Sequence, residues 1–142
     1  MVANNGWLIF ALGSAFFAAL TAILGKFGVA DINSNMATFV RTFVVLAMTL
    51  GIVLMRQEWQ PLQKISRFGF CMLALSGVAT GLSWLCYWRA MQLGDASKVA
   101  PVDKLSVIIV ILLAALFLNE PLTWKTALGG LLVTAGAIVI AW

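Results

Sequence analysis

Histidine is absent from this 142-residue sequence, and Asp and Glu together number only 5. No group of Cys, Asp and Glu residues has the spacing of metal ligands, and no nucleophile has a matching base. A nucleotide-binding P-loop is excluded as well, because Leu20 stands where the motif that would end in Gly25 and Lys26 requires its first glycine. The sequence therefore predicts no catalytic residue, no metal and no cofactor, and hence no enzyme.

Charged residues are also few, at 10% of the chain, where a soluble domain carries about 25%. Apolar residues reach 63%, and a water-soluble fold of this length cannot hide that much apolar surface. The 2 cysteines, Cys71 and Cys86, lie about 22 Å apart along one predicted helix, so they cannot pair with each other. Linkers and low-complexity tracts are missing, so we expect residues 1–142 to form a single membrane domain.

A helix needs about 20 mostly apolar residues to cross the hydrocarbon core of a membrane, and lipid admits only helices or closed barrels. The apolar runs here do not alternate as barrel strands do, so the predicted fold class is an all-α integral membrane protein with five transmembrane helices. The first run has no basic region before it and is too long for a signal-peptide core, so we expect it to remain as a span. The predicted spans are residues 7–29, 35–55, 68–91, 99–118 and 123–142.

The connections between these spans are short, which makes consecutive helices antiparallel neighbours. The longer segment 56–67 is either an interfacial helix after Pro61 or a solvated loop. Five spans place the termini on opposite sides, and basic residues are spread almost evenly over both, so the chain can insert in either orientation. On the side of the N-terminus, side A, they are Arg56, Lys64, Arg67 and Lys125; near the other side, side B, they are Lys26, Arg41, Arg89, Lys98 and Lys104.

Ionisable residues within or near the spans gather at one depth close to side B. A charge at the bilayer centre costs from about 2.5 to more than 10 kcal/mol, so such residues pair with one another or face a wet cavity. Four of the five are cations, which predicts a positively biased vestibule that favours an anionic or carboxylate-bearing small molecule. The five residues are Lys26, Arg41, Arg89, Asp103 and Lys104.

Asp103 is the one acid inside a predicted span, which makes it the candidate coupling group. Neighbours on a helix point about 100° apart, so we expect Asp103 not to pair with Lys104. Arg41 is its predicted partner, because its depth matches and its helix also starts on side B. Pro101 predicts a kink beside Asp103, and bent helices next to charges are typical of substrate sites in secondary transporters.

Other roles for these residues stay open. Lys26 and Arg89 are close enough to the surface to anchor helix ends by snorkelling, and Arg41 with Asp103 could form a purely structural pair. Trp84 and Trp88 share one helix face, either as members of an interfacial belt or as an aromatic wall of a ligand site.

Glycines at helical spacing mark faces where helices approach closely in lipid. From the sequence it is open whether the glycines of the fifth span make contacts within the chain or between two copies. The glycines concerned are Gly77 and Gly81 in the third span and Gly129, Gly130 and Gly136 in the fifth.

Three motifs lie close together in the second half of the chain: AMQLGDASKVAP at 90–101, DKLS at 103–106 and NEPLT at 119–123. Together they resemble the conserved end of an EamA-type half of the drug/metabolite transporter superfamily, and the length resembles its half-size bacterial members. The resemblance implies a ten-helix working unit built as an inverted repeat, which five spans supply as a homodimer, antiparallel if the chain inserts both ways.

The resemblance further implies secondary transport of small metabolites or drug-like molecules by alternating access in the bacterial inner membrane, coupled to protons or sodium ions. The related four-helix multidrug exporters use a glutamate in their first helix, whereas this first span has no acid, so Asp103 takes the coupling role. Glu120 is expected to cap the last helix. The alternative to a transporter is a non-transporting assembly or regulatory subunit.

Overall fold

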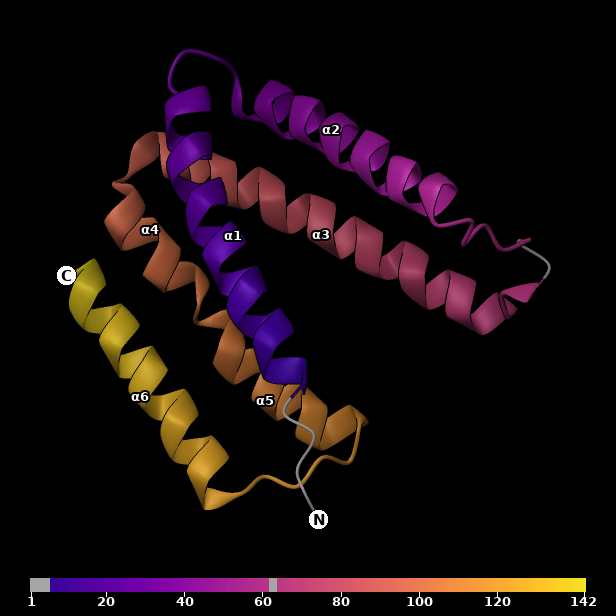
Figure 1. The fold of residues 1–142 in the computed structure, drawn as a ribbon. Coiled ribbons are helices and arrows are strands. Elements are labelled where there is room, and N and C mark those ends of the chain that lie inside the picture. The colour runs from indigo at the N-terminus through magenta and orange to yellow at the C-terminus, as the bar shows by residue number, and fades with distance from the viewer. Residues whose placement is uncertain (1–5, 62–63) are drawn as a thin grey trace. The chain divides into compact units, whose positions relative to one another are not determined.

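The computed structural model describes residues 6–61 and 64–142, and over these ranges it contains helices and no strands. Five stretches are long and apolar enough to cross a membrane, with the fourth, Ala96–Phe117, made of two shorter helices. The predicted all-α membrane fold with five spans is therefore confirmed. The helices, shown in Figure 1, are α1 Gly6–Gly28, α2 Ser34–Met55, α3 Arg67–Leu93, α4 Ala96–Asp103, α5 Ser106–Phe117 and α6 Trp124–Ala141.

Large apolar side chains cover the outside of these helices. Phe10 is 82% exposed, and Phe27 and Val139 are each 78% exposed. A soluble monomer rarely shows such an apolar surface, whereas hydrocarbon chains cover it in a bilayer. The interior is made largely of small residues, among them Ala22, Ala37 and Ala137. Close helix approach through small side chains is how helices pack in lipid.

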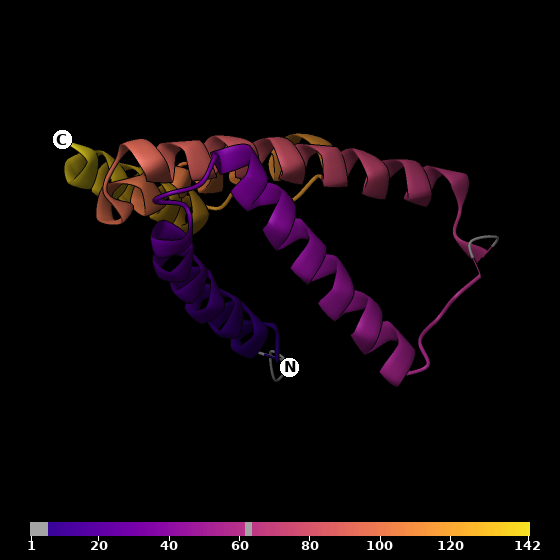
Figure 2. The ribbon, with the colours of Figure 1, turned by 90° about the horizontal axis from the view of Figure 1, so that it is seen from above.

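The chain forms two compact units. The first unit combines residues up to Phe27 with residues 93–142, and the second unit is residues 28–92. The prediction of a single membrane domain stays a prediction. Within the second unit, α2 and α3 lie close together where α2 begins and spread apart toward the connection that joins them (Figure 2).

In the first unit, α6 packs along both α4 and α5. Gly130 lies at the contact with α5, because a Cβ atom at its position would lie 2.9 Å from Cδ1 of Ile111. Gly129 and Gly136 have open space where a Cβ would be. Of the three glycines of α6, Gly130 thus makes a contact within the chain.

The predicted fourth span is interrupted instead of running straight. α4 ends at Asp103 and α5 begins at Ser106. Across the interruption the amides of Lys104 and Leu105 donate to carbonyls three residues back, at 3.0 Å each, which is the tighter 3₁₀ pattern. Pro101 lies inside α4 and has no amide hydrogen to continue the regular pattern there.

The start of α6 differs from expectation. The predicted Glu120 cap is wrong, because Thr123 occupies the N-cap of α6 and its hydroxyl accepts from the amide of Thr126 at 3.2 Å. Thr and Ser are good caps because a short hydroxyl reaches the amides of the first turn, and Glu120 lies too far upstream for that. At α4 the cap position belongs to Asp95.

The connection between α2 and α3 begins with a left-handed residue. Gln57 has φ 55, and the amides of Gln57 and Glu58 donate to Leu54 and Val53 at 3.2 and 3.0 Å. This is the Schellman arrangement that closes many helices, with glutamine in the position that glycine usually takes. The interfacial helix considered after Pro61 includes Leu62, which lies outside the described residues.

Candidate functional site

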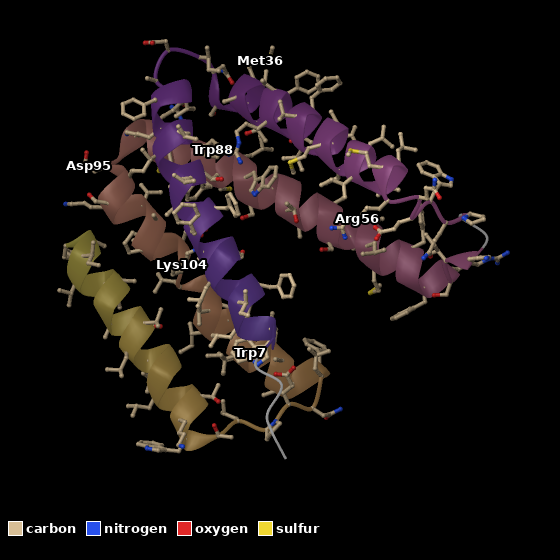
Figure 3. The ribbon with its side chains drawn as sticks, viewed as in Figure 1. Trp7, Met36, Arg56, Trp88, Asp95 and Lys104 are labelled. Atoms are coloured by element: carbon tan, nitrogen blue, oxygen red, sulfur yellow. The ribbon has the colours of Figure 1, made fainter. Side chains whose placement is uncertain are left out.

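Arg41 lies against two tryptophans inside the second unit. Its Cζ atom is 4.1 Å from the ring centre of Trp88 and 5.2 Å from that of Trp84. The two tryptophans are one turn apart on α3 and so present their rings on one face. Figure 3 labels Trp88 on the part of α3 near the first turns of α2, which begin close to Met36. The structure thus brings together three of the residues predicted for the site, which we call the Arg41 stack.

The Arg41 stack is held by aromatic packing. Trp88 is only 1% exposed, and the ring of Tyr87 meets it edge-on with centres 5.0 Å apart. A cation over an indole face gains roughly 0.5 to 2 kcal/mol, the larger values where water is excluded. Within the second unit, the partners of Arg41 are therefore the faces of two tryptophan rings.

Two N–H donors in the stack are left over. Nη1 of Arg41 and Nε1 of Trp88 are both buried, and neither has a hydrogen-bond partner among the described residues. More than about 90% of buried polar groups in proteins find a partner, and leaving one unpaired costs about 1 to 3 kcal/mol. The stack therefore carries unused hydrogen-bonding capacity beside a positive charge.

Gln92, a residue not predicted from the sequence to belong to the site, lies in the last turn of α3 and makes three side-chain hydrogen bonds. Its Nε2 donates to the backbone oxygens of Val29 at 3.0 Å and Ile32 at 2.7 Å, while its Oε1 accepts from Nη1 of Arg89 at 3.1 Å. The amide thereby ties the connection between α1 and α2 to the end of α3. The sequence feature that could have pointed to Gln92 is a side-chain amide, with its two N–H donors, in the last turn of an otherwise apolar helix.

Lys26 makes a comparable contact in the first unit. Its Nζ donates to the backbone oxygen of Gly94 at 2.8 Å, just beyond the end of α3. A cation at a helix C-terminus also interacts favourably with the helix dipole. The contacts of Lys26 and Arg89 favour the anchoring role over a substrate role for these two cations, and a substrate role stays a prediction.

Asp103 is the last residue of α4, and Lys104, which Figure 3 labels, lies in the interruption before α5. Nζ of Lys104 lies 3.2 Å from Oδ2 of Asp103, so the expectation that these neighbours cannot pair is wrong. Lys104 stands outside α4, and its long flexible side chain can bend back to the preceding carboxylate. Asp103 and Arg41 belong to different units, and their pairing stays a prediction.

Comparison with known proteins gives a consistent result. The sequence profile of the EamA-like transporter family matches residues 5–142. An uncharacterized transporter in the cobO 3' region of Sinorhizobium sp is 48% identical over 138 residues, which make up 97% of this chain and 98% of that protein. The uncharacterized transporter YvbV of Bacillus subtilis (strain 168) is 28% identical over 139 residues, 94% of this chain and 44% of that relative. No solved structure matches the chain.

Proposed function

The chain belongs to the EamA-like transporter family, and on that premise we propose that it is a secondary transporter of small, preferentially anionic metabolites. The observation that carries the proposal is the Arg41 stack: a permanently charged side chain inside an apolar span, with two buried donors that have no partner among residues 6–61 and 64–142. Such an arrangement in a membrane helix is costly, and charged residues within spans typically mark a ligand site or an ion pathway.

The charge of Arg41 supports an anionic substrate. Its guanidinium is a permanent cation that lies against Trp84 and Trp88, whereas the contacts of Lys26 and Arg89 favour anchoring. Coulomb attraction in a poorly screened region raises the local concentration of anions and disfavours organic cations. Drug-like molecules that carry a carboxylate would be accepted on the same basis.

Asp103 is the proposed coupling group, binding a proton or a sodium ion. It is the one acid of the predicted site, and it lies at the end of α4 where the helix is interrupted before α5. Interrupted helices beside charged groups give transporters a flexible joint at the substrate site. Alternating access would then come from movement of the helices about this joint.

Two copies are proposed to form the working transporter. The Bacillus subtilis relative matches this chain over 44% of its length, which leaves room in that protein for a second segment of similar size. The nearly even distribution of Lys and Arg over both sides allows the two copies to insert in opposite directions. Relatives from two bacteria support a bacterial inner-membrane location.

Replacing Asp103 by Asn in reconstituted vesicles tests the proposal. Wild-type vesicles should accumulate members of a mixed panel of small organic anions under an imposed proton or sodium gradient, and the Asn variant should lose gradient-driven accumulation. Asp31→Asn is the matched control, because Asp31 is an exposed acid in the short connection before α2. Absence of accumulation by well-folded wild-type protein would favour a non-transporting assembly or regulatory subunit.

A further inference from the structure

The two unused donors of the Arg41 stack belong to one small region of the second unit. Nη1 is bonded directly to the Cζ atom that lies 4.1 Å above the Trp88 ring, and Nε1 is part of that same indole. Both nitrogens are buried, and the indole that carries Nε1 is 1% exposed. The two donors therefore belong to side chains that stack directly on each other.

Resting on the proposed function, we infer that these two N–H groups bind the carboxylate of the transported molecule. Guanidinium and indole N–H groups donate only, so their ligand must be an acceptor. A carboxylate offers two acceptor oxygens, and its hydrogen bonds to charged donors are among the strongest that proteins make. The ligand would thereby remove the cost of both unpaired donors at once.

Charge balance selects a carboxylate over a phosphate. The stack holds one positive charge, that of Arg41, and the carboxylate group brings one negative charge. A phosphate dianion would leave an excess negative charge among the buried rings of Trp88 and Tyr87, which costs far more than a neutral pair. Arg89, the nearest other cation along α3, is bonded to Gln92 at 3.1 Å.

Neutral isosteres of carboxylates give a test that needs no variant. Binding of acetate, pyruvate and benzoate to the purified chain in dodecyl maltoside is measured by isothermal titration calorimetry, each beside its amide and beside inorganic phosphate. We expect at least one carboxylate to bind about tenfold or more tightly than its amide. Preference for phosphate, or equal affinity for every acid and amide, would overturn the inference and point to a lipid headgroup or to no ligand.

Two substitutions locate the binding. Trp88→Phe removes the N–H and keeps most of the ring, so carboxylate affinity should fall roughly ten- to a hundredfold. Arg41→Lys keeps the positive charge and loses the planar guanidinium group, so the affinity for carboxylates should fall while carboxylates still bind more tightly than their amides. Trp124→Phe and Arg56→Lys are the matched controls, since both residues are exposed and far along the chain from the stack. Unchanged affinity in both stack variants would overturn the inference.

The same protein samples separate this inference from the proposed function. Carboxylate binding that depends on Trp88, with no flux in vesicles, would support the binding site and contradict transport. Flux of several metabolites without preference for carboxylates would keep transport and contradict the binding site.

Discussion

Gln92→Ala is expected to loosen the end of α3 measurably. The substitution removes two hydrogen bonds to the backbone oxygens of Val29 and Ile32 and one from Arg89. The bonds with Arg89 and Ile32 are exposed and contribute less than a buried bond. The part-buried bond to Val29 contributes about 0.5 to 1.5 kcal/mol, so the total loss in free energy of unfolding should be about 1 to 2 kcal/mol.

The assay is reversible unfolding in mixed micelles of detergent and dodecyl sulfate, followed by circular dichroism. Gln92→Glu should be at least as destabilising as the alanine variant, because it sets a carboxylate oxygen against two carbonyl oxygens. Gln60→Ala, in the exposed connection after α2, is the control and should unfold like wild type. A Gln92→Ala protein within about 0.5 kcal/mol of wild type would refute the role given to this amide.

Three further predictions use the same assay. Gly130→Leu should destabilise by about 1 to 3 kcal/mol because its side chain would collide with Ile111, whereas Gly129→Leu should not, since that position is open. Comparable losses in both variants would contradict the packing of α5 on α6. Thr123→Ala should lower the free energy of unfolding by about 1 kcal/mol because it removes the cap of α6. An unchanged free energy of unfolding would contradict the capping role of Thr123. Gln57→Gly should stabilise by up to about 1 kcal/mol because φ is 55 there; a loss of stability would contradict this left-handed helix end.

The spans could be predicted because apolar composition and length alone decide which segments enter a membrane. The predicted and observed ends differ most at α4, which begins at Ala96 instead of 99. Pro101 indicated a bend, but not that a 3₁₀ turn follows it, since that depends on how the chain around Lys104 and Leu105 finds alternative hydrogen bonds. The Glu120 cap was wrong because several polar residues precede α6 and only geometry shows which one reaches the first turn.

The candidate site residues could be selected from the sequence, but their contacts could not, and their role as a site stays a prediction. Depth along the helices pointed to Arg41, and helical spacing placed Trp84 and Trp88 on one face. The stacking of Arg41 on the two tryptophans depends on how α2 packs against α3, which the sequence does not show. The pair of Asp103 with Lys104 was missed because regular helix geometry does not hold at the end of α4. Gln92 was missed because a neutral amide at a helix end has no pattern that separates it from a surface residue.

Uptake of small anions by the wild-type chain tests the proposed activity most directly. Vesicles with and without the protein are given equal panels of organic anions and organic cations under each imposed ion gradient, and the lumenal contents are measured by mass spectrometry. We expect saturable accumulation of one or more anions, absent from empty vesicles. Accumulation of cations instead, or contents identical to those of empty vesicles, would contradict an anion transporter built around Arg41.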